Sequence, residues 1–453
     1  MSSPFPRRTS WGLKLSGREN QDIRYLTHCC RRTIVAIGEC PQPVLEDILH
    51  LASENSTILS ALLALSARQR MSDANHARAT HPASGGAPHA PPSRSCWAAL
   101  DWYQATITKT PGSAVSGADA VEVLCSCELL ALFAFPEHVH NWSMHVGGMI
   151  AVLESLDREL VRTLPLVRNA RSIAAYWDIA AFALNRPERS QQTWLRWGLG
   201  PRPRGRGHGA AFAGDAPAAF SPFEISTGYP ETLITVIALV SAVMEDNLLR
   251  NTGRGDETRS AEDHDSVGLQ DSPVLYWTSR MHVIIAEWEP PAIPPHISTT
   301  LSLALSNAWE IMRKAAHIYL TRGGFATSVY TPRATQRERT NRRFVREMIF
   351  GLQSLISLAE EQEITIANAM IWPMTVIGNE ICDDRSLQRE LVALFHRLQT
   401  YFRIAHFNQV LDLLAELWQR FADSTSLVDS MEPPAALSLQ ILAAEKDLSV
   451  PLF

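Results

Sequence analysis

The fold is decided by the segment Met370-Ile-Trp-Pro-Met374 and by two apolar patterns that follow it, Leu391–Phe402 and Val410–Phe421. In both patterns the apolar residues recur at steps of three and four, which places them on one side of a helix. Two such helices, joined by a short link, are expected to pack as a hairpin against a third surface. Pro373 lacks a backbone N–H, so we expect it to interrupt the preceding helix and to set Trp372 at a bend.

Helical spacing recurs along most of the chain. Apolar residues fall at steps of three and four in 44–52, 58–68, 121–133, 149–160, 167–181, 277–288, 301–320 and 344–359. The segment 233–243 is apolar on every side, which suits a helix buried all round. Asn55-Ser-Thr57 supplies side-chain oxygens that would cap the helix beginning near Ile58. No sustained period-two alternation occurs, so almost no sheet is expected. The sequence therefore predicts an all-α fold, a multi-helix bundle of antiparallel helical hairpins.

Composition restricts the class of protein. With 46% apolar and 19% charged residues, the chain is typical of globular rather than disordered proteins. The net charge of -6 gives no overall attraction to phosphate backbones, so any nucleic-acid contact would need a local patch. Residues 1–20 lack the apolar block of a secretory signal, and the longest apolar run, 233–244, is shorter than the roughly 20 residues that span a bilayer. A soluble intracellular protein with no membrane contact is expected.

The seven cysteines argue against a structural zinc site. They are Cys29, Cys30, Cys40, Cys96, Cys125, Cys127 and Cys382, and no Cys-x-x-Cys pair occurs among them. Structural zinc sites gather several thiolates or imidazoles through such short spacings. We therefore expect reduced thiols, most of them small core residues.

Several short motifs follow one another in a recognisable order. They are Leu59-Ser-Ala-Leu-Leu-Ala-Leu-Ser-Ala67, Trp142-x-x-His145-x-x-Gly148, Tyr176-Trp-Asp-Ile179 with Leu184-Asn-Arg-Pro187, Ile371-Trp-Pro373 with Gly378-Asn-Glu380, and the closing helix ending at Trp418. Together they resemble the regulatory, or middle-homology, region of fungal zinc-cluster transcription factors. Trp11–Ser16 resembles the segment that follows the zinc cluster in that family, so the chain is expected to begin where the DNA-binding module of its relatives ends.

The resemblance suggests a division of the chain. It places an N-terminal arm at 1–27, the regulatory domain at 28–421 and a C-terminal tail at 422–453. Stretches rich in Gly, Pro or charged residues predict flexible insertions in the domain near 73–95, 198–222 and 251–271.

Histidines and tryptophans are candidates for a binding site. His138, His140 and His145 are close in sequence, but no thiol or carboxylate stands at ligand spacing, so histidines of a turn or of the core are preferred and no metal is predicted. Four tryptophans could line a ligand pocket, although aromatics at helical spacing are more often core. They are Trp142, Trp177, Trp372 and Trp418.

Catalytic motifs are absent from the sequence. No nucleophile elbow, phosphate-binding loop or dinucleotide fingerprint occurs, so neither an enzyme nor a cofactor is predicted. Asp178 is the one carboxylate of interest in an apolar helix, 167–181. An ion pair or a cap within the bundle is preferred over a functional acid.

Two arginine-containing stretches could contact other molecules. Arg202, Arg204 and Arg206 alternate with Pro and Gly, as in arms that enter the minor groove, although a solvated linker is preferred. The run Arg333–Arg346 is usually a charged helix face and could also serve in nuclear import.

The resemblance implies a nuclear regulator of transcription that controls a biosynthetic gene cluster. Its helical domain would receive a metabolite or a partner protein, and DNA would be reached indirectly through transcription factors or co-regulators. Two alternatives stay open. One is an enzyme or small-molecule-binding protein that has reused the fold, with Asp178 or the histidines as acid and base. The other is a truncated gene product, which an upstream exon with six cysteines would restore to an ordinary DNA-binding factor.

Overall fold

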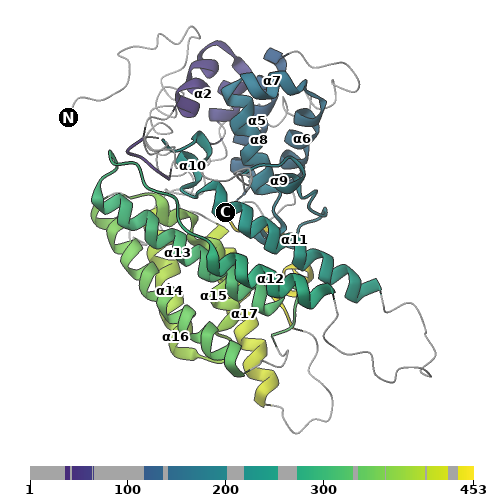
Figure 1. Ribbon diagram of the computed structural model, residues 1–453, viewed down its shortest axis with the longest axis vertical. Coiled ribbons are helices and arrows are strands. Elements are labelled where there is room, and N and C mark those ends of the chain that lie inside the picture. The colour runs from purple at the N-terminus through teal and green to yellow at the C-terminus, as the bar shows by residue number, and fades with distance from the viewer. Residues whose placement is uncertain are drawn as a thin grey trace, which may run out of the picture. The chain divides into compact units, whose positions relative to one another are not determined.

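A computed structural model describes residues 36–40, 43–63, 65, 117–135, 141–200, 219–253, 273–329, 335–362, 364–402, 406–426 and 437–453. Almost every element in these ranges is a helix (Figure 1), so the all-α prediction is confirmed. Within them, the strands amount to one short antiparallel pair, β1 (Ala183–Leu184) with β2 (Val450–Pro451). None of the described helices is long and apolar enough to cross a membrane.

The described residues form two compact units. The first unit takes them from Met1–Ala175, Ser221–Thr227 and Gln399–His406, and the second unit takes the remainder. In the first unit, α5 (Gly117–Ala134) packs along α6 (Asn141–Ser155). Other helices of this unit are α2 (Pro43–Glu54), α7 (Arg158–Thr163), most of α8 (Pro165–Trp177) and α10 (Pro222–Thr227).

The helix after Asn55 begins as the sequence predicts. Its helical residues start at Ser56, and the Asn55 side-chain oxygen accepts hydrogen bonds from the backbone N–H groups of Thr57 at 2.8 Å and Ile58 at 3.2 Å. The predicted cap is therefore confirmed, and it satisfies two donors that have no partner inside the helix.

The second unit is built around α13 (Thr299–Arg322). α14 (Thr335–Gln362) and α15 (Ile371–Glu380) lie beside it (Figure 1). The Trp309 side chain of α13 is fully buried, and its indole N–H donates to the Gly228 carbonyl at 2.7 Å. The further elements of this unit are η1 (Ala180–Phe182), α9 (Thr193–Arg196), α11 (Glu231–Gly253), α12 (Pro273–Glu287), η2 (Ile366–Met370), most of α16 (Arg385–Phe402) and of α17 (His406–Ser426), and α18 (Leu439–Glu445).

A helix boundary lies just before Pro373, but the bend predicted at Trp372 is wrong, because Trp372 lies within α15. The 3₁₀-helix η2 ends at Met370 and α15 begins at the next residue. Pro373 thus stands in the first turn of α15, where its missing N–H would have had no partner within the helix. Trp372 beside it is buried.

The apolar faces predicted for the last two long helices are also confirmed. Their buried side chains include Leu391, Leu394, Phe395 and Leu398 of α16, and Val410, Leu413, Leu414 and Leu417 of α17. The Trp418 indole N–H of α17 donates to the Gly378 carbonyl of α15 at 2.9 Å. This bond fixes the two helices at close approach.

Gly378 leaves no room for a side chain at that approach. A Cβ built there would lie 2.5 and 2.6 Å from the two methyl carbons of Leu414, which is itself fully buried. We expect Gly378→Ala to lower the free energy of unfolding by about 1–3 kcal/mol, because overpacking forces the helices apart. Urea denaturation followed by circular dichroism measures the change.

Gly38→Ala is the matched control. A Cβ at Gly38 meets nothing within 4 Å, so this variant should stay within about 0.5 kcal/mol of the wild type. Equal stabilities of the two variants would contradict the close contact at Gly378.

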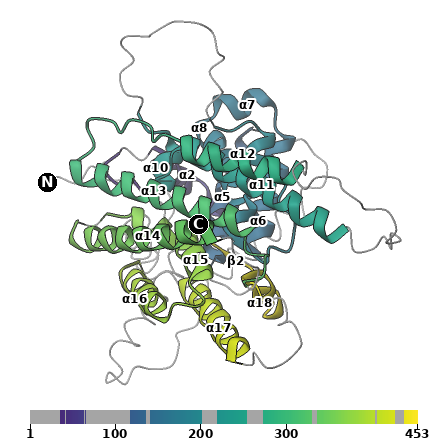
Figure 2. The same ribbon diagram turned by 60° about the horizontal axis from the view of Figure 1, so that its bottom comes forward.

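One helix ends earlier than the sequence predicts. The helix predicted over 167–181 ends at Trp177, because the chain turns at Asp178 and Ile179 adopts an extended conformation before η1. The segment 437–453, which falls in the predicted tail, is folded into the second unit. There α18 and β2 lie close together (Figure 2), and the Leu452 N–H donates to the Phe182 carbonyl at 2.9 Å.

Candidate functional site

Asp178 is the centre of a buried polar cluster in the second unit. Its side chain is 0% exposed and forms an ion pair with the Arg186 guanidinium at 2.9 Å. The same oxygen accepts from the Gln191 N–H at 3.2 Å, and the other oxygen accepts from the Thr193 N–H at 3.0 Å and its hydroxyl at 2.9 Å. Both carboxylate oxygens are therefore occupied by protein groups, which tie the loop 178–193 to the end of α8.

Local sequence allows this loop to turn tightly. Asn185 and Gln192 adopt left-handed backbone conformations, with φ of 47° and 52°. Asn is among the residues that tolerate this region best, and it stands in the Leu184-Asn-Arg-Pro187 motif. The Asn185 N–H donates to the side chain of Gln440 at 3.1 Å, so α18 holds the turn in place.

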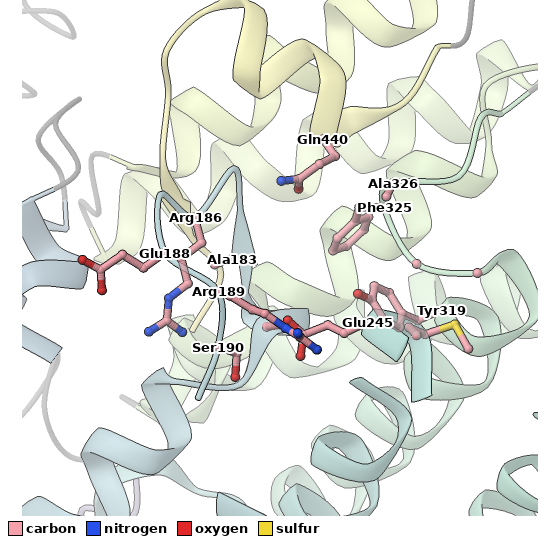
Figure 3. Close-up of a pocket in the computed structure, with 14 residues that line it drawn as sticks. Ala183, Arg186, Glu188, Arg189, Ser190, Glu245, Tyr319, Phe325, Ala326 and Gln440 are labelled. Carbon is pink, nitrogen blue, oxygen red and sulfur yellow. The ribbon is translucent and has the colours of Figure 1, made fainter. Parts of the chain in front are cut away.

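A cavity of about 180 Å³ lies next to this loop. Its walls come from residues 180–190, from the α11 residues Met244 and Glu245, from Tyr319 and the turn 323–326 after α13, and from Gln440. Figure 3 shows the side chains of Arg189, Glu245 and Tyr319 gathered on one side of it. Polar groups from three separate elements thus converge on one space that also has apolar walls, a combination found in small-molecule sites.

Burial shapes the chemistry of the two central groups. It raises the pKa of the Glu245 carboxyl, which the Gln192 amide at 3.5 Å and the Arg189 charge oppose. Burial, and then the charge of Glu245, raise the pKa of Tyr319, so its hydroxyl stays protonated at neutral pH. The cavity therefore offers the Glu245 carboxylate and the Tyr319 hydroxyl, in addition to the exposed Glu188 carboxylate and the Ser190 hydroxyl of the loop.

Aromatic rings form the wall behind Tyr319. Its ring lies 5.1 Å from that of Phe325 and 5.8 Å from that of Trp372, measured between centroids. Trp372 in turn makes a T-shaped contact with Phe182, with ring centroids 5.2 Å apart. Trp372, which the sequence singled out, lies one ring behind the cavity and does not line it.

The other candidates in the second unit have structural contacts. Trp177 stacks on Phe453 with centroids 5.8 Å apart, and Trp418 bonds the Gly378 carbonyl. Neither Trp177 nor Asp178 lines the cavity.

Trp142 and His145 lie in the first unit, on α6. Trp142 is fully buried and meets Phe135 edge-on at 6.2 Å. Burial lowers the pKa of His145 to about 4, so its imidazole is neutral at physiological pH. No group of three His, Cys, Asp or Glu side chains that could hold a metal occurs in the described part of the chain. His138 and His140, like Arg202, Arg204 and Arg206, lie outside the described residues.

Sequence reasoning missed the residues that line the cavity. A signal for Glu245 was present, because this carboxylate directly follows the long apolar run of α11. Tyr319 stands in the Ile-Tyr-Leu segment at the end of α13, where helical spacing indicated core. Their meeting depends on how α11 packs against α13, which no local pattern encodes.

Comparison with known proteins identifies one related family. A model of the fungal specific transcription factor domain matches residues 24–432. No curated protein and no solved structure matches the chain. The family match covers the part of the chain that carries nearly all the motifs described above.

Proposed function

Because the chain belongs to the family defined by the fungal specific transcription factor domain, and is thus a transcriptional regulator, we propose that its helical units receive a signal that controls transcription. The signal is a metabolite or a partner protein, and its arrival changes the association of the chain with co-regulators in the nucleus. The genes under control are those of a secondary-metabolite biosynthetic cluster. The observation that carries the proposal is the family match, which spans most of the chain.

The proposed route to DNA is indirect, through partner transcription factors. The 453 residues carry a net charge of -6, which repels the phosphate backbone at long range. They also contain no Cys-x-x-Cys pair from which a binuclear zinc cluster could be assembled. Both properties support recruitment by a partner over direct contact.

Measurements of promoter binding in the cell and in solution distinguish recruitment by a partner from direct contact with DNA. We expect chromatin immunoprecipitation to recover promoters of contiguous biosynthetic genes, because a partner brings the chain there. In a gel shift at physiological salt, the purified chain should not bind these promoters with sequence specificity. A tight, sequence-specific shift by the chain alone would overturn the indirect route, and recovery of no promoter would overturn the proposed regulatory role.

A small-molecule-binding role is the second candidate, and the cavity beside Glu245 and Tyr319 favours it. The version in which Asp178 acts as a catalytic acid has no such support. Asp178 is fully buried and both its oxygens accept bonds from protein groups, so no substrate atom has room to approach it. The two roles are compatible, because a bound metabolite can serve as the signal.

A further inference from the structure

We propose that the cavity between the loop 180–190, α11 and the turn after α13 binds a small primary amine with an apolar body, whose ammonium group meets Glu245 and Tyr319. The inference rests on the proposed signal-receiving function and names the chemical class of the signal. The residues that carry it all belong to the second unit.

The size of the cavity limits the ligand. Its volume is about 180 Å³, and an apolar cavity of roughly 150 Å³ is enough to hold benzene. The ligand therefore has about ten non-hydrogen atoms. Ala183, Met244, Phe325 and Ala326 provide apolar wall that would contact its body.

The charges around the cavity favour a cation over an anion. Arg186 directs its guanidinium to the Asp178 carboxylate at 2.9 Å and to the Asp178 carbonyl at 2.9 Å, so its charge is already compensated. Arg189 is 55% exposed and lies 3.7 Å from Asp246, and its charge also acts on Glu245. Its attraction for an anion is therefore shared between two carboxylates and weakened by water. Glu245 is the half-buried carboxylate of the lining, and an ammonium beside it would offset the cost of its burial.

Tyr319 provides the second polar partner. A Cβ built on Gly324 would lie 3.1 Å from the Tyr319 hydroxyl oxygen. The hydroxyl can occupy this position because Gly324 has no side chain. Gly324 also has a φ of +81°, which a side chain would strain. The phenol oxygen can accept one ammonium hydrogen while the Glu245 carboxylate accepts another.

Ligand binding would stabilise the C-terminal segment 437–446. Gln440 lines the cavity, its N–H donates to the Phe325 carbonyl at 3.3 Å, and its side chain accepts from the Asn185 N–H at 3.1 Å. The Val329 N–H also donates to the Leu437 carbonyl at 2.9 Å. A ligand that bridges these walls stabilises the folded segment 437–446 against local opening.

Three probes of matched size test the proposal on the full chain: phenethylamine, phenethyl alcohol and phenylacetate. We expect isothermal titration calorimetry at pH 7 to rank them in that order, with a dissociation constant for the amine on the order of 1 mM or below, as suits so small a ligand. Hydrogen exchange should slow in 437–446 when the amine is bound.

Two variants remove the site in different ways. Glu245→Gln keeps the shape of the side chain but removes its charge, and should weaken amine binding about tenfold while leaving the alcohol nearly unchanged. Ala326→Phe fills the cavity while leaving the charge of Glu245 in place, and should abolish binding of all three probes. Glu390→Gln changes an exposed carboxyl of α16, outside the cavity, and should bind like the wild type.

The results decide between clear outcomes. The proposal is overturned if no probe binds at about 10 mM, if phenylacetate binds best, or if both cavity variants bind the amine as the wild type does. Circular dichroism of each variant shows that it is folded. Because the titration needs neither DNA nor a partner, its failure would leave the promoter results untouched, and the reverse also holds.

Discussion

Asp178→Ala is expected to lower the free energy of unfolding by about 3–5 kcal/mol. The substitution leaves the Arg186 guanidinium, whose side chain is 9% exposed, without the carboxylate that compensates its charge. It also leaves the backbone N–H groups of Gln191 and Thr193 without an acceptor. Urea denaturation should show a lower midpoint with an unchanged slope.

Asp246→Ala provides the comparison. Asp246 is 57% exposed and lies 3.7 Å from Arg189, so water screens the pair and its loss should cost less than about 1 kcal/mol. If both variants lost the same stability, the buried cluster would not be holding the loop 178–193.

Breaking the ion pair of Arg322 and Glu380 is expected to have a similarly large effect on stability. It joins the last turn of α13 to the last residue of α15, with two hydrogen bonds, one of them of 2.9 Å between Arg322 Nη2 and Glu380. The side chains are 13% and 2% exposed. Arg322→Met and Glu380→Gln should each lower the free energy of unfolding by about 3–5 kcal/mol, because each leaves the charge of a buried partner uncompensated.

A double-mutant cycle measures the pairing itself. The double variant should lose much less than the sum of the two single losses, because it leaves no uncompensated charge. The same cycle on Arg342 and Asp383, whose side chains are 41% and 38% exposed, should give a coupling below about 1 kcal/mol. Additive losses at Arg322 and Glu380 would show that the pair contributes nothing specific.

The ion pair at Glu380 shows which contacts a sequence motif can predict and which it cannot. Gly378-Asn-Glu380 was recognised from the sequence, and so was the apolar face of α17 that covers it. The partner of Glu380 was not, because Arg322 lies at the far end of another helix and has no periodic relation to it. A motif shows which residue types a position carries, while packing decides what each side chain meets.

The candidate site was anticipated less well. None of the six residues named from the sequence as possible pocket or core residues lines the cavity, and Trp142 and His145 belong to the first unit. Large aromatic side chains are easily noticed in a sequence, but they stabilise a fold most when their large apolar surface is buried. Trp142 and Trp372 are both buried in the core. Glu245 and Tyr319 lie on helices whose apolar residues predicted burial in the core and gave no indication of a binding site.

The sequence by itself determined the helices, the boundary at Pro373, the cap at Asn55 and the family, because each rests on local periodicity, side-chain chemistry or motif order. Tertiary structure alone decided the end of α8 at Trp177, the docking of 437–453 and the convergence of Glu245 with Tyr319. The two-residue strands are too short to leave an alternating pattern, and the buried polar contacts join residues far apart in the chain. Such contacts form only once the apolar faces have fixed how the helices pack.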